Sequence, residues 1–491
     1  MTAVLLTVPV FKEVRALAFP WLACLFVMIL PAVAGAPEFL GDLSVPAYFL
    51  GAAALGALSI GHEYTGRTLG LLLSLPARRE RLLLVKGAVL ASMLLTLWAV
   101  ADTLVFRVVR APESEKLAAS LLPVLCAFFL APWLTMACRN PIAGTVFTLA
   151  IPGMLLALGA WVGATKYGPG PESVDVMLTI LWRGALILCA IGGVASWRLF
   201  MRLEAIDGPG ADVRLPQWLP WPARASTTAP AVTKRPIWLL VKKELHLHQM
   251  ALAVAGLYLL GWVAVVSLRP LIANVDDVFT VLTVFYVALL ALLIGSNASA
   301  GERQLGTLEW QVLLPVATSK QWAVKVGVVW VLALVLAAGL PTVYTSLTPG
   351  MGPTQLLRPK SAAAIVLLTA SSLYTSSLCS SGLWALLMTL AAIVGAGTLL
   401  GAASNWGIAS YAATVRMRSA VAPAGVGGLP PTQVLALLIS AVFAAVLLRL
   451  ALANHRSADR GAGRVWRQAI LITVIFIAGL VMFLAIEAFR R

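Results

Sequence analysis

Long apolar runs follow one another along almost the whole chain, from Leu17 to Ile486. A helix that spans a membrane needs about 20 mostly apolar residues, and the runs are of that kind. Of the 491 residues, 60% are hydrophobic and 11% are charged, which lies far outside the usage of soluble globular domains. The sequence therefore predicts an all-α polytopic membrane protein without a large soluble domain.

A polar segment between two apolar runs occurs twice, as Glu63–Lys86 and Glu302–Lys325. The two copies superpose without a gap, although Glu and Lys are scarce elsewhere in the chain. We interpret this as an internal duplication. The shared residues are Glu63, Thr68, Leu69, Pro76 and Lys86 in the first copy and Glu302, Thr307, Leu308, Pro315 and Lys325 in the second.

The duplication also covers the segment ahead of each half, because the pair Lys12-Glu13 returns as Lys243-Glu244. We predict two six-helix repeats and a thirteenth transmembrane helix over Ala469–Ile486, which has no counterpart in the first half. The predicted divisions are residues 1–204 for the first half, 205–236 for a Pro-rich cytoplasmic linker, 237–455 for the second half, and 456–491 for a basic turn with the extra helix.

The formal net charge of +16 would suggest nucleic acid as a partner of a soluble chain, but its distribution indicates membrane topology instead. Lys and Arg are concentrated in the loops on one side of the predicted topology, and that side holds both repeated segments. By the positive-inside rule, these loops and the N-terminus are cytoplasmic in an inner, multi-pass membrane protein, and no nucleic acid is expected. The five cysteines and four histidines lack paired or metal-ligand spacing, so we expect no disulfide and no metal site.

Each repeated segment begins where a span leaves the bilayer, and the leucines after Glu63 have helical spacing. The proline then ends that short helix. Lys86 and Lys325 fall just inside the next apolar run, where we expect their stems to extend to the lipid headgroups. The interfacial anchors predicted in this way are Lys12, Glu13, Lys86, Lys243, Glu244 and Lys325.

Residues 302–308, followed by Pro315, Thr318-Ser319 and Lys325, resemble the segment after the second span in ABC-2 type transporter permeases. The resemblance implies a fold like that of type V ABC exporters, in which this segment is the coupling helix on which an ATPase subunit acts. The first copy departs from the pattern, because Arg67 stands where the second copy has Gly306. The coupling residues that the resemblance implies are Glu63, Gly66, Arg67, Thr68, Pro76, Glu302, Gly306, Thr307 and Pro315.

The chain has no Gly-x4-Gly-Lys-Ser/Thr loop, so we expect ATP and Mg to bind in a partner and not in this chain. Two coupling segments imply two copies of an ABC ATPase subunit, with membrane lipid and accessory subunits as further partners. The expected function is export by a transport subunit that is not itself an enzyme. Two alternatives remain, a secondary transporter with two parallel six-span halves and a membrane-embedded enzyme that modifies lipids.

Two charged residues lie within apolar runs, where charge is costly and suggests pairing or function. They are Asp102 in the third predicted span and Arg183 in the sixth. The predicted topology places both toward the outer ends of their spans. We therefore expect an intramembrane ion pair between Asp102 and Arg183.

Overall fold

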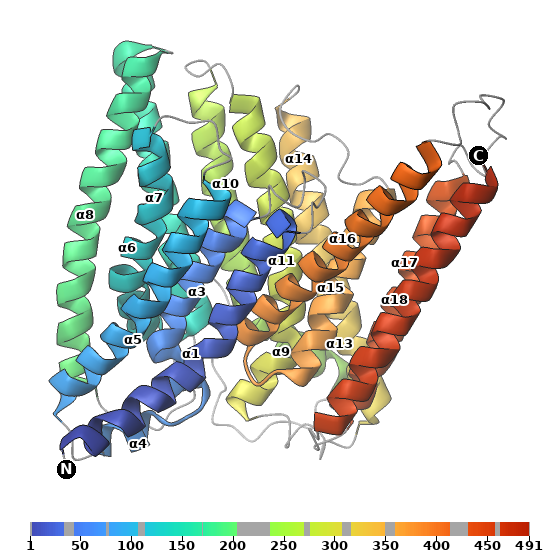
Figure 1. Cartoon of the computed structure of the whole chain (residues 1–491), viewed down its shortest axis with the longest axis horizontal. Helices are drawn as coiled ribbons and strands as arrows, with labels where there is room; N and C mark the ends of the chain where they lie inside the picture. The colour runs from blue at the N-terminus through green and yellow to red at the C-terminus, as the bar shows by residue number, and fades with distance from the viewer. Residues whose placement is uncertain are drawn as a thin grey trace.

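The structure, a computed structural model, describes residues 2–33, 44–74, 78–106, 113–168, 170–203, 236–269, 275–306, 316–348, 359–412, 431–456 and 462–490. Within these ranges the chain is helical and contains no strand. Most helices run along one direction and form a single bundle, and the chain passes through it from α1 to α18 (Figure 1). The predicted all-α class is confirmed. The predicted linker lies almost wholly outside the described residues.

The helices of the first part of the chain are α1 (Thr2–Val33), α3 (Ser44–Thr65), α4 (Leu69–Ser74), α5 (Arg79–Val100), the π-helix η1 (Ala101–Val105), α6 (Glu113–Cys138), α7 (Pro141–Tyr167) and α8 (Pro171–Met201). Those of the second part are α9 (Pro236–Leu247), α10 (Gln249–Leu268), α11 (Val275–Leu305), α13 (Thr318–Leu332), the π-helix η2 (Ala333–Gly339), α14 (Leu340–Leu347), α15 (Pro359–Leu378), α16 (Gly382–Ala412), α17 (Pro431–His455) and α18 (Ala462–Arg490).

Eleven described helical stretches are long and apolar enough to cross a membrane, which makes this a multi-pass membrane protein. Six of them lie between Val10 and Met201, as predicted, and five between Gln249 and His455. The apolar part of α16, Gly382–Thr398, is shorter. The apolar run predicted as a thirteenth span is part of the continuous helix α18.

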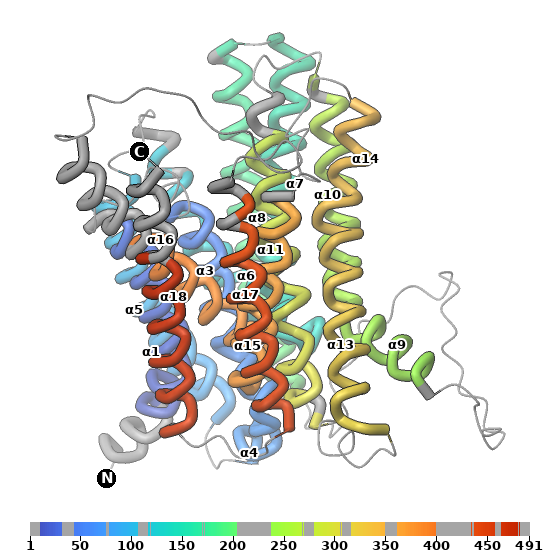
Figure 2. The backbone as a smooth tube through the Cα atoms, turned by 90° about the vertical axis from the view of Figure 1, so that its right-hand side faces the viewer, coloured from blue at the N-terminus to red at the C-terminus, as the bar shows by residue number. Residues whose placement is uncertain are grey.

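The segment ahead of the first span differs between the two parts of the chain. Before the seventh predicted span, α9 is a separate helix that projects sideways from the foot of the bundle (Figure 2). The corresponding Lys12 and Glu13 instead lie within the long helix α1, which continues without a break into the first span. Because the chain turns at His248 but continues as helix after Glu13, only the second part has this break. The start of α1, α4 and α9 all lie at the same end of the bundle (Figures 1 and 2).

Close helix packing in the core depends on two glycines at equivalent positions, each seven residues before the repeated Glu. A Cβ on Gly56 of α3 would lie 2.1 Å from the Ala127 carbonyl oxygen of α6. A Cβ on Gly295 of α11 would lie 2.6 Å from the Thr369 carbonyl oxygen of α15. Small residues allow helix backbones to approach closely in membranes. In both parts, the span that ends in the repeated segment is thereby held against the span two further along the chain, α6 for α3 and α15 for α11.

The last helix is attached through buried polar groups. The side-chain amides of Asn454 on α17 and Gln468 on α18 bond reciprocally, at 2.8 and 3.1 Å. The Tyr374 hydroxyl of α15 donates to Gln468 at 3.2 Å, and Asn454 donates to the Ser377 hydroxyl at 3.0 Å. Because buried amides are costly when unpaired, these bonds fix α18 in one register on the core.

Candidate functional site

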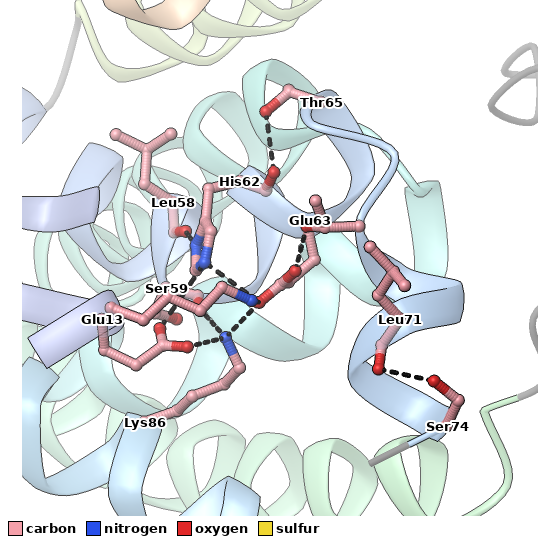
Figure 3. A network of polar contacts seen from close by, with 11 residues as sticks. Glu13, Leu58, Ser59, His62, Glu63, Thr65, Leu71, Ser74 and Lys86 are labelled. Atoms are coloured by element: carbon pink, nitrogen blue, oxygen red, sulfur yellow. Dashed lines mark hydrogen bonds and ion pairs between the residues drawn. The ribbon is translucent and has the colours of Figure 1, made fainter. Parts of the chain in front are cut away.

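Four charged side chains and one histidine form a buried cluster at the foot of α1, α3 and α5 (Figure 3). The Lys86 ammonium group lies 2.7 Å from Glu13 Oε1 and 3.1 Å from Glu63 Oε1. Lys12 lies 2.8 Å from the same oxygen of Glu63. His62 Nε2 lies 3.1 Å from Glu63 Oε1. We call these five residues the first cluster.

Local structure places these side chains together. Lys12 and Glu13 are adjacent on α1, and Glu63 lies in the last turn of α3. The Thr68 hydroxyl, just beyond that helix end, donates to Glu63 Oε2. Lys86 reaches across from α5 and also donates to the Ser59 carbonyl at 3.3 Å. Three helices are thus joined through one carboxylate.

A second cluster forms at the foot of α9, α11 and α13. The Lys325 ammonium group lies 2.6 Å from Glu302 Oε2 and 3.4 Å from Glu244 Oε1. Lys243 pairs with Glu302 Oε1. Lys325 also donates to the Ala298 carbonyl at 2.8 Å. We call Lys243, Glu244, Glu302 and Lys325 the second cluster.

The two clusters are built from equivalent residues in the same order. Lys86 and Lys325 even bond to carbonyls at the same distance along the chain, on Ser59 and Ala298 respectively. Residues that were predicted separately, as interfacial anchors and as coupling residues, therefore meet in one cluster in each part of the chain. Each adjacent Lys-Glu pair supplies two contacts to its cluster. Its lysine pairs with the repeated glutamate, and its glutamate pairs with the repeated lysine.

The expected extension of Lys86 and Lys325 to lipid headgroups is wrong. Lys325 is 0% exposed and Lys86 is 3% exposed. The physical reason is that two carboxylates lie within reach of each ammonium group, so pairing inside the protein replaces hydration at the interface. Lys12 and Lys243 remain partly exposed at the rim of the clusters and retain access to the surface.

Burial favours the neutral forms of two titratable groups, Glu244 within the second cluster and His248 near it. Burial raises the pKa of Glu244, and the Glu302 carboxylate acts in the same direction, while Lys325 opposes them. Burial lowers the pKa of His248 to about 4, with Lys325 adding to this effect, so its imidazole is neutral at pH 7. Lys325 and Glu302 thus form the central ion pair of the second cluster.

The repeated segments touch each other just beyond the clusters. Arg67 has φ of 53° and its equivalent, Gly306, has φ of 65°, so both backbones take the same left-handed turn. A Cβ on Gly306 would lie 2.7 Å from Nη2 of Arg67, so the guanidinium group packs directly on that glycine. The departure of the first copy from the sequence pattern therefore keeps the backbone conformation and adds a contact between the copies.

Gly306→Ala is expected to destabilise the protein by about 1–2 kcal/mol, because alanine disfavours the left-handed region. The Cβ of alanine would also meet the guanidinium group of Arg67, but this exposed side chain can move aside, so an Arg67→Gly background should recover little of the loss. A double-mutant cycle on thermal unfolding in detergent measures the coupling between the two positions. A large coupling energy would show that Arg67 is held firmly on Gly306.

Other predicted coupling residues are spread over the same region. Gly66 and Arg67 are exposed, and Thr68 is half-buried at the end of α3. The short helix α4 follows, with Leu72 buried and Leu71 70% exposed. Pro76, Thr307 and Pro315 lie outside the described residues. The part of the first segment that offers accessible side chains is therefore α4 and its flanks, while Glu63 is buried.

The predicted ion pair between Asp102 and Arg183 is not formed. Asp102 lies in η1 and Arg183 in α8, both side chains are exposed and described, and no ion pair joins them. The sequence suggested a pair from the opposite charges and the expected depth of the two residues, but it could not show which helices lie against each other. The two residues face different surroundings.

Ligand atoms of Glu13, His62 and Glu63 lie within 4.8 Å of one another, a spacing that could suit a metal ion. The ammonium groups of Lys12 and Lys86 already pair with these carboxylates. Adding a divalent cation beside the buried Lys86 ammonium group and the partly exposed Lys12 ammonium group would be unfavourable. The donor set therefore fits an ion-pair cluster better than a metal centre.

Sequence reasoning missed the involvement of His62 and the pairing of Glu13 with Lys86. A signal was present, because Lys12-Glu13, Glu63 and Lys86 all recur in the second half, and a shared buried contact is one reason for such recurrence. His62 carried no such signal, since Gly301 takes its place in the second copy. The chain matches no protein-family model, no curated protein and no solved structure.

Proposed function

We propose that this protein is the membrane-spanning permease of an ABC-2 type exporter, built as two fused six-span halves. The observation that carries the proposal is the pair of matched buried clusters. In each, a Lys-Glu pair near the start of the half meets the Glu at the end of the second span and the Lys of the third. Two matched clusters at one end of the bundle are what two identical ATPase subunits, each acting on one half, would require.

The clusters suggest how force would enter the membrane. Glu63 binds α1 through Lys12 and α5 through Lys86, so displacement of the segment after α3 would move three helices together. Glu302 would act in the same way on α9 and α13 through Lys243 and Lys325. Glu63 and Glu302 would thus join helices inside the protein and would not contact the ATPase. The ATPase would contact α4 and the residues beside it.

The remaining parts of the proposal follow from this arrangement. ATP and Mg would bind in two ATPase subunits on the cytoplasmic side, at the end of the bundle that holds α4 and α9 (Figure 2). Their closure would shift the equilibrium between two arrangements of the halves, which moves substrate out across the cytoplasmic membrane. Membrane lipid surrounds the bundle, and accessory subunits are compatible with it.

Tagged protein purified from its native membranes is expected to carry a P-loop ATPase, identified by mass spectrometry. The double variant Leu71→Asp with Arg78→Glu, both exposed beside the proposed contact, should reduce the recovered ATPase on the order of tenfold, or about 1.4 kcal/mol of binding. Charge reversal of Glu63 or Glu302 would not test this contact. Both glutamates are buried and paired with lysines, so the substitution would disrupt the clusters themselves.

The matched control is Glu172→Arg, an exposed charge change at the start of α8, at the other end of the bundle (Figure 1). It should leave the recovered ATPase unchanged. Purification without any ATPase, together with transport by the chain alone in an ion gradient, would reject the permease proposal.

A further inference from the structure

The break between α9 and α10 leaves one backbone carbonyl without its usual helical partner. In a continuous helix the Ala251 N–H would donate to the carbonyl of Leu247, four residues earlier. At the break it donates instead to the carbonyl of His248, at 2.9 Å, because His248 has φ of −96° and ψ of 19° and leaves the helical conformation. The carbonyl of Leu247, the last residue of α9, therefore needs another donor.

Asn297 supplies that donor from the neighbouring helix α11. Its side-chain Nδ2 donates to the Leu247 carbonyl at 2.7 Å. Two glycines leave room for the amide group. A Cβ on Gly301 would lie 2.8 Å from Asn297 Oδ1, and a Cβ on Gly382 would lie 3.2 Å from the same atom. The amide group thus fits beside the break and satisfies the carbonyl that the break exposes.

The first part of the chain lacks this donor. The position equivalent to Asn297, five residues before the repeated Glu, is Leu58. Leu58 is buried in the apolar core, and a leucine side chain has no hydrogen to donate. The position equivalent to His248 is Leu17, and there α1 continues without a break. The entry helix is therefore broken in the part that has the amide and continuous in the part that has leucine.

The ion pairs of the clusters do not require the break. The adjacent lysine and glutamate of α1 make their contacts from a continuous helix. The adjacent lysine and glutamate of α9 make the equivalent contacts from a separate helix. Both helix geometries are thus compatible with the same set of ion pairs, and the Asn297 amide is a contact that the continuous helix does not have.

We propose that Asn297 is the latch of a hinge at His248, and that α9 has two positions. With the latch closed, α9 projects sideways from the foot of the bundle (Figure 2). With the latch open, α9 continues into α10 in the manner of α1, because the Leu247 carbonyl then regains its donor from Ala251. The proposal stands independently of the permease function. The hinge belongs to the second part of the chain alone.

The test is hydrogen–deuterium exchange of the full-length protein in detergent, followed by mass spectrometry at Gln249 and Met250. These residues lie in the first turn of α10, where N–H groups have no partner within the helix. Asn297→Leu places the residue of the first part at the latch, with a similar shape. We expect the two amides to exchange on the order of tenfold more slowly, because a continuous helix supplies their acceptors from α9. Unchanged or faster exchange would overturn the proposal, since a simple loss of stability accelerates exchange.

Asn297→Ala covers the case in which Asn297→Leu does not fold, because it removes the donor without adding atoms. It should slow exchange at the same two amides, and native-like exchange would contradict the latch. The matched control is Asn454→Leu, which removes the buried amide that joins α17 to α18. This variant loses a side-chain amide in the same way and should not slow exchange at Gln249 or Met250. Equal slowing in both variants would show that the effect does not come from the hinge.

Discussion

Lys325→Met is expected to lower the free energy of unfolding by about 3–5 kcal/mol, because it removes a buried ammonium group from between two carboxylates. Lys325 is fully buried and lies between Glu302 at 2.6 Å and Glu244 at 3.4 Å. Methionine has a similar volume, so packing is kept while two buried carboxylates lose their shared cation. The measurement is unfolding in a titration of mixed micelles with SDS, followed by tryptophan fluorescence.

Two variants calibrate this result. Lys320→Met removes an exposed charge five residues earlier on α13 and should change stability by no more than about 0.5 kcal/mol. Glu244→Gln in the Lys325→Met background should recover part of the loss, because one of the unpaired carboxylates is then gone. If Lys325→Met behaves like Lys320→Met, the second cluster does not hold the helices together.

Gly56→Leu is the second substitution with a large expected effect, at the upper end of the about 1–3 kcal/mol that overpacking costs. A Cβ at this position would lie 2.1 Å from the carbonyl oxygen of Ala127 and 2.7 Å from the Cβ of Ala131. A backbone carbonyl within a helix cannot rotate away, so α3 and α6 would have to separate. We expect loss of monodisperse protein in gel filtration and a lower Tm.

The matched control is Gly153→Leu on α7, where a Cβ would meet no atom within 4 Å. It makes the same chemical change on an exposed helix surface and should be tolerated. Gly295→Leu should resemble Gly56→Leu, because a Cβ there would lie 2.6 Å from the Thr369 carbonyl. Equal behaviour of Gly56→Leu and Gly153→Leu would show that α3 and α6 are not in close contact.

The sequence predicted the spans well because the position and length of an apolar run can be read directly along the chain. The six stretches from Val10 to Met201 could be located from hydropathy alone, and so could the position of the polar segments between spans. The recurrence of Lys12-Glu13, Glu63 and Lys86 in the second half indicated which residues matter. The equivalence of Gly56 and Gly295 was also available in the sequence and was overlooked.

The contacts themselves could not be predicted, because they depend on how each helix is rotated about its axis. Lys86 had the spacing of an interfacial lysine, and only the approach of α1 to α5 brings Glu13 within 2.7 Å of it. Asp102 and Arg183 suit each other in charge, but they lie on η1 and α8 and do not pair. Depth along a helix is encoded locally, whereas the direction of a side chain depends on every helix packed around it.

The contact between Arg67 and Gly306 distinguishes the two copies of the segment. If the first copy were replaced by the second, a glycine would face a glycine, and the contact would be lost. With two first copies, an arginine would stand on both sides. The contact therefore needs one copy of each kind, which a chain with two different halves supplies and a homodimer of either half would not.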